Sequence, residues 1–147
     1  MIYVLDTDTL SLLGHGDSPE APRIRGRIVE LPAEDSVVTT IVNYEEQMRG
    51  WMAALSSARS SKTEVRIYSR LLQHLETFRR LTVLGYTDDA ASTLDRFRRQ
   101  RPRIGAMDLK IASIVLTHKA VLVARNAADF SGIPDLRIED WSRETEN

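Results

Sequence analysis

The stretch that decides the fold is Ile2-Tyr3-Val4-Leu5-Asp6-Thr7-Asp8, because it joins a short apolar run to two acidic residues. An apolar run of this length, bounded by polar residues, is typical of a buried β-strand. Residues 7–13 then read as a short helix that stops at Gly14 and Gly16. This order predicts an α/β unit whose first strand ends at carboxylates.

The rest of the chain alternates between short apolar strands and longer helical segments. Helices are predicted over residues 19–31, 41–57, 63–81, 88–101 and 108–118, and further strands at 37–40, 82–84, 121–123 and 137–138. Asp88 or Asp89 is the expected cap of the helix from 88, and 108–118 has the clearest amphipathic pattern. Strands separated by helices pair in parallel through crossovers. We therefore expect a three-layer α/β/α domain with a central, mostly parallel sheet.

Size and composition are those of one ordinary globular domain. The chain has 147 residues, 42% of them hydrophobic, and no linker or repeat, so we expect a single domain over 1–147. No apolar run approaches the ~20 residues of a membrane span, and no signal peptide is recognisable. The absence of cysteine excludes disulfides and thiolate chemistry. A cytoplasmic location is the expectation that fits these features.

The charge distribution is more informative than the net charge of −1. Arginines gather in two clusters, one at Arg23, Arg25 and Arg27, the other at Arg96, Arg98, Arg99, Arg101 and Arg103. Such clusters can neutralise phosphates. A solvated helix face followed by a loop is an equally open interpretation.

Acidic residues lie beside the carboxyl ends of several predicted strands. They are Asp6 and Asp8 after the first strand, Glu45 and Glu46 after the second, and Asp108 and Asp129 on either side of strand 121–123. Parallel sheets bind ligands at this edge. Carboxylates brought together there would repel one another unless a cation lay between them.

An oxygen-only donor set favours Mg²⁺ or Mn²⁺, because the chain has no cysteine and its three histidines are scattered. Such cations activate water and neutralise phosphoryl oxygens, as phosphodiester hydrolysis requires. Each acid alone also has an ordinary explanation: a helix cap for Asp6, Asp8 or Asp108, a surface position for the glutamates, a turn for Asp129. The combined pattern favours the metal site.

Five segments resemble the motifs of VapC-type PIN domains, in the family's order. They are residues 2–11 with the first acid, 40–50, 103–113 with an aspartate heading an Ile-Ala-rich helix, 121–130 and 138–141. In the second motif a glutamate stands four residues before a glycine, which selects Glu46 over Glu45. Ala124, where threonine or serine is common, and Asp8, where asparagine is frequent, depart from the pattern.

The resemblance implies a PIN fold and a Mg²⁺- or Mn²⁺-dependent endoribonuclease, the toxin of a type II toxin–antitoxin pair that inhibits translation and growth. It implies a homodimer and a cognate VapB-like antitoxin as partner. It assigns metal binding and catalysis to Asp6, Glu46, Asp108 and Asp129, and orienting hydrogen bonds to Thr7 and Asn126. The second arginine cluster (Arg96, Arg98, Arg99, Arg101 and Arg103) would hold RNA phosphates.

Three alternatives stay open. A catalytically inactive PIN scaffold would keep the fold without cleaving RNA. A haloacid-dehalogenase-like phosphatase would use Asp6 and Asp8 and an acidic pair such as Asp88-Asp89, but it leaves Glu46 and Asp108 without roles. A response-regulator receiver would need a lysine after a late strand, and Lys119 precedes one instead.

Overall fold

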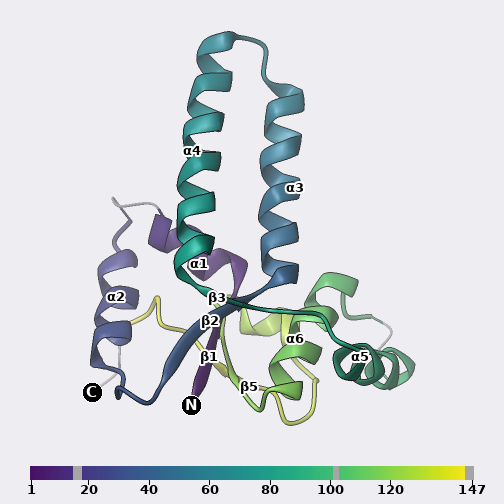
Figure 1. The fold of residues 1–147 in the computed structure, drawn as a ribbon. Helices are drawn as coiled ribbons and strands as arrows, with labels where there is room; N and C mark the ends of the chain where they lie inside the picture. Colours follow the sequence, from purple (N-terminus) through teal and green to yellow (C-terminus); the bar gives the residue numbers. More distant parts are fainter. Residues whose placement is uncertain (15–17, 101–102, 145–147) are drawn as a thin grey trace.

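The computed structural model describes residues 1–14, 18–100 and 103–144 and contains a five-stranded sheet with helices on both faces (Figure 1). The strands are β1 (Ile2–Leu5), β2 (Ser36–Thr40), β3 (Thr82–Leu84), β4 (Val121–Val123) and β5 (Arg137–Glu139). Every neighbouring pair is parallel, in the order β3-β2-β1-β4-β5. The predicted three-layer α/β fold is therefore confirmed.

The strand order reverses at β1, and we call the edge of the sheet at the carboxyl ends of β1 and β4 the crevice. From β1 the chain builds outward through β2 and β3, then returns to add β4 on the other side of β1. Connections that leave in opposite directions open a gap at this edge of a parallel sheet, which is where such folds bind ligands. The acids that follow β1 and β4 thus flank the crevice.

The helices divide between the two faces. They are α1 (Thr7–Gly14), α2 (Ala21–Glu30), α3 (Ile41–Ser57), α4 (Ser61–Arg80), α5 (Asp88–Gln100) and α6 (Ala106–Thr117), with a short 3-10 helix η1 (Ala127–Phe130). Because side chains alternate along a strand, Leu122 packs with α5 and α6, whereas Val123 packs with α1, α2 and α4. Both faces of the sheet are therefore buried in apolar cores.

Helix α6 is more deeply buried than its sequence pattern indicates. Every residue from Ile111 to Val115 is buried, including Ser113, so α6 is not the amphipathic helix that was predicted. It packs against α3, α5 and the sheet at once. The predicted cap of α5 was also wrong: the Thr87 hydroxyl accepts the N–H of Ala90 at 3.3 Å, and Asp88 and Asp89 lie in the first turn.

Helices α3 and α4 form a long hairpin that projects beyond the sheet (Figure 1). The apolar residues that mark the helical period of α4 are mostly exposed there: Val65, Tyr68, Leu72 and Leu75 each keep more than half of their surface accessible. Only Phe78, near the base of the hairpin, reaches the core. None of the described helices is long and apolar enough to cross a membrane.

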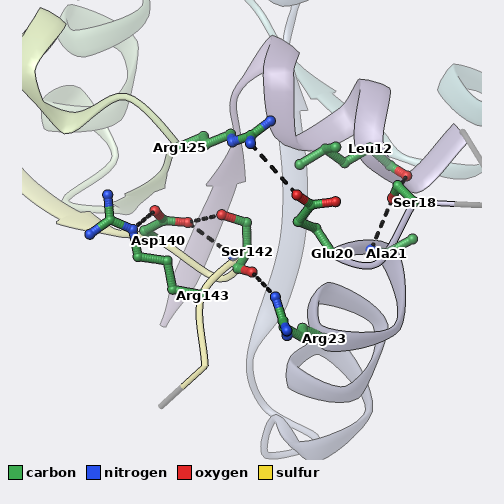
Figure 2. A network of polar contacts seen from close by, with 9 residues as sticks. All are labelled: Leu12, Ser18, Glu20, Ala21, Arg23, Arg125, Asp140, Ser142 and Arg143. Atoms are coloured by element: carbon green, nitrogen blue, oxygen red, sulfur yellow. Dashed lines mark hydrogen bonds and ion pairs between the residues drawn. The ribbon is translucent and has the colours of Figure 1, made fainter. Parts of the chain in front are cut away.

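Polar contacts join α2 to the C-terminal segment, and the residue before α2 to the residue two positions after the end of β4 (Figure 2). Arg23 donates to the Ser142 carbonyl oxygen at 3.2 Å, and Arg125 lies 3.6 Å from Glu20. Trp141 is buried, with its ring 5.1 Å from that of Tyr3. Arg23, in the first of the two arginine clusters, is thus engaged within the protein.

Candidate active site

Asp6 stands at the crevice, directly after β1. Its backbone N–H donates to the Val123 carbonyl oxygen at 2.9 Å, which extends the pairing of β1 with β4 and fixes the residue's position. Its carboxylate accepts a hydrogen bond from Asn43 Nδ2 at 2.9 Å. Burial raises the pKa of Asp6 to about 6, and the charges of Glu46 and Asp8 add to that rise, against hydrogen bonds from Thr7 and Asn43 that lower it.

Glu46, rather than its neighbour Glu45, faces the crevice. Glu46 Oε1 accepts the Thr7 hydroxyl at 3.0 Å, whereas Glu45 pairs with Arg49 at 2.8 Å on the exposed side of α3. Burial raises the pKa of Glu46, and the nearby charge of Asp108 contributes further. Adjacent helical residues point about 100° apart, so the structure brings only Glu46 to the site.

Asp108 and Asp129 approach from the other side of the crevice. Asp108 lies in the first turn of α6, whose N-cap is Gly105, and burial followed by the charge of Asp129 raises its pKa. Asp129 lies in η1 and accepts a hydrogen bond from Asn126 Nδ2 at 3.0 Å. Asn126 thus contacts a predicted site carboxylate, as Thr7 does.

Electrostatic repulsion links all four predicted acids. The charge of Glu46 raises the pKa of Asp6, the charge of Asp108 raises that of Glu46, and the charge of Asp129 raises that of Asp108. Within the described ranges, no three acidic or histidine side chains are already positioned to hold one metal ion. The acids are neighbours around the crevice, and their oxygen-only donor set fits Mg²⁺ or Mn²⁺.

Asn43 is the site residue that the sequence pattern did not reveal. Its side chain is completely buried and donates to both Asp6 and Thr7. The available signal was an asparagine three residues before Glu46, a spacing that puts both on one helix face. A buried amide needs partners, but the sequence does not say which groups supply them.

Comparisons with known proteins agree over nearly the whole chain, although no family model matches. A curated Ribonuclease VapC1 of Haemophilus influenzae (strain R2866) is 28% identical over 145 residues, 97% of this chain and 100% of that protein. The solved VapBC-1 of nontypeable Haemophilus influenzae has a TM-score of 0.77 at 24% identity, over 97% of this chain and 100% of that chain. The structure of DNA-bound VapBC from Salmonella typhimurium has a TM-score of 0.74 at 25% identity, over 96% of this chain and 98% of that chain.

The resemblance to VapC-type PIN domains is confirmed. This fold also explains why the charges of the four acids interact with one another, which the phosphatase alternative does not. The second acidic pair that a phosphatase would use, Asp88-Asp89, follows β3 at the edge of the sheet, two strands away from β1. Neither residue is among the charges that shift the pKa of Asp6.

The second arginine cluster lies at the end of α5 and just after it. Arg96, Arg98 and Arg99 are exposed, and the Arg96 guanidinium lies 5.4 Å from the centre of the Phe97 ring. Arg103 is also exposed. Arg101 lies outside the described residues. None of the ion pairs found in the described part of the chain involves these arginines.

Asp6→Asn is expected to stabilise the metal-free protein at pH 7.5. The pKa of Asp6 is about 6 in the folded protein and 3.8 ordinarily, so the folded state holds this proton more tightly than the unfolded state. The free energy of unfolding is therefore highest below pH 3.8 and falls as the pH rises through 6. Removing the charge should restore about 3 kcal/mol, or roughly 6–12 °C in Tm. Thermal melts in EDTA at pH 7.5 and 4.5 measure this, and the gain should shrink at pH 4.5.

The control is Asp95→Asn, which neutralises an exposed acid on α5 away from the crevice and should change stability by less than about 0.5 kcal/mol. If Asp6→Asn melted below the parent at pH 7.5, the Asp6 carboxylate would be a stabilising part of the fold and the argument from repulsion would be wrong.

Proposed function

We propose that the chain is a Mg²⁺- or Mn²⁺-dependent endoribonuclease that acts as the toxin of a type II toxin–antitoxin pair. The observation that carries the proposal is the series of mutually repelling acids, Asp6, Glu46, Asp108 and Asp129, beside the carboxyl ends of β1 and β4. The curated relative named Ribonuclease VapC1 supports RNA as the substrate. Through RNA cleavage the protein would inhibit translation and growth, and we place its action in the cytoplasm.

The crevice suits a divalent cation because its acids form no ion pair with any described residue. Burial and mutual repulsion raise the pKa values of Asp6, Glu46 and Asp108. A cation there would offset both effects. When bound, it would supply an activated water and neutralise phosphoryl oxygens.

The protein's own groups hold and orient this arrangement. Asp6, Glu46, Asp108 and Asp129 would bind the metal directly or through water. Thr7 keeps one Glu46 oxygen in place, and Asn126 does the same for Asp129. The arginines of the second cluster would bind RNA phosphates along α5.

Two partners follow from the same proposal. The solved relatives are VapBC assemblies, so we infer that this chain binds a cognate VapB-like antitoxin. We also infer a homodimer. The exposed apolar side chains of the α3–α4 hairpin, including Tyr68, Leu72 and Leu75, form the kind of surface that interfaces cover.

RNA cleavage by the purified protein should require a divalent cation. We expect activity with Mg²⁺ or Mn²⁺, complete loss in excess EDTA and recovery when the metal is restored, measured by sequencing the ends of cleaved RNA. Full activity in metal-free buffer would contradict the mechanism. A folded, dimeric protein that cuts no RNA with either metal would favour the inactive scaffold, and a phospho-aspartyl adduct at Asp6 would favour the phosphatase.

A further inference from the structure

The buried side-chain amide of Asn43 links the acid that follows β1, Asp6, to the acid on α3, Glu46. Asn43 Nδ2 donates to Asp6 Oδ1 at 2.9 Å and to Thr7 Oγ1 at 3.1 Å. The Thr7 hydroxyl in turn donates to Glu46 Oε1 at 3.0 Å. A single side chain therefore contacts one predicted metal ligand directly and a second through one hydroxyl.

Only one orientation of this amide satisfies all of its neighbours. An ionised carboxylate can only accept, so the nitrogen of the Asn43 amide must face Asp6. Its oxygen then accepts the proton of the Thr40 hydroxyl at 2.7 Å, while Thr40 Oγ1 accepts the backbone N–H of Asn43. Because Thr7 Oγ1 receives a proton from Asn43, its own proton is directed to Glu46.

The start of α3 anchors this relay. Thr40 is the N-cap of α3, and the hydrogen bonds between Thr40 and Asn43 lock the cap to the amide. Both residues have no exposed surface, so water does not compete for these groups. Glu46 follows three residues later on the same face. The helix start thus sets the separation between the Asp6 and Glu46 carboxylates.

We propose that Asn43 is a positioning residue that aligns the Asp6 and Glu46 carboxylates for metal binding. The inference rests on the proposed metal-dependent function and adds a residue to it. Asn43 touches neither RNA nor metal; it acts by orienting Asp6 and, through Thr7, Glu46. Its loss should therefore lower metal affinity and turnover and leave RNA binding largely unchanged.

The test compares Asn43→Leu with Thr39→Val in the full-length protein. Leucine branches at the same atom as asparagine, although it is larger, and it removes both hydrogen bonds that the amide donates. Thr39 is equally buried nearby, but its hydroxyl donates to the Leu5 carbonyl oxygen at 3.0 Å rather than to a carboxylate. Thr39→Val therefore removes one buried hydrogen bond without touching the acids. Asn43→Ser, which is too short to reach both partners, is a second variant in case leucine prevents folding.

Mn²⁺ affinity by calorimetry and RNA cleavage kinetics are the two measurements. For both Asn43 variants we expect Mn²⁺ binding about 10-fold weaker and kcat roughly 10–100-fold lower, with KM for RNA within about twofold of the parent. Thr39→Val should stay within about twofold in all three. Adding Thr7→Val to Asn43→Leu should lower kcat little further, because the two residues act in one relay.

The outcomes separate this inference from the proposed function. A parent that neither binds Mn²⁺ nor cleaves RNA would overturn both. A parent that does both, with folded Asn43 variants that match it in Mn²⁺ affinity and kcat, would overturn the positioning role alone. Equal losses in Thr39→Val would also overturn it, because a general loss of buried hydrogen bonding would then explain the effect.

Discussion

Glu46→Gln is expected to reduce RNA cleavage by at least about 100-fold, whereas Glu45→Gln should leave it within about twofold. Glu46 faces the crevice beside Thr7, and its charge interacts with that of Asp108. Glutamine keeps an oxygen that can accept the Thr7 hydroxyl, so the local fold should survive. What it removes is the negative charge that a divalent cation would require. Growth arrest after induced expression should disappear with the cleavage.

Glu45→Gln is the matched control because it makes the same chemical change one residue away. Glu45 contributes an exposed ion pair with Arg49, and such pairs are worth about 0–1 kcal/mol. Initial rates at saturating Mg²⁺, with melting curves for both variants, measure the difference. Loss of activity in Glu45→Gln alone would mean that the register of α3 around the crevice is wrong.

Asp108→Asn is expected to abolish most cleavage, by about 100-fold or more, without lowering the melting temperature measured in EDTA. Asp108 follows the N-cap of α6, and burial together with the charge of Asp129 raises its pKa, so its charge opposes folding when no cation is present. Asparagine keeps the shape and removes that charge. Activity and stability should therefore respond in opposite directions.

Mg²⁺ provides the second measurement on the same pair. A ligand that binds only the folded state raises its stability according to its affinity, so added Mg²⁺ should raise the melting temperature of the parent more than that of Asp108→Asn. If Asp108→Asn instead melted far lower and still cut RNA, Asp108 would serve only the structure of α6 and the metal assignment would be wrong.

Much of the site could be predicted from sequence because it depends on a local rule. A short apolar strand followed by an acid puts that acid at the carboxyl edge of a parallel sheet, and Asp6 and Asp129 follow this rule. The glycine spacing selected Glu46 over Glu45, and the structure turns Glu46 toward Thr7. The RNA and metal roles of these residues stay predictions.

The features that sequence did not predict depend on what lies next to each element in space. The apolar period of α4 correctly marked a helix, but not that Leu72 and Leu75 stay exposed, because periodicity does not show which surface covers a face. Helix α6 is buried on nearly all sides because three neighbours enclose it. Asn43 donates a hydrogen bond to Asp6, 37 residues earlier in the chain, and a local sequence pattern does not reveal a contact over that distance.

The central position of β1 has a consequence for how the protein assembles as it is synthesised. Tyr3 pairs with Val121, far later in the sequence, and the N–H of Asp6 donates to the Val123 carbonyl oxygen. Contacts between such distant parts of a chain form slowly, because a long loop must close first. A nascent chain that has passed β2 and β3 still lacks Asp108, Asp129 and the strand that borders Asp6. Asp6 therefore gains its neighbouring strand and its facing acids only after the segment that carries β4 and Asp129 has left the ribosome.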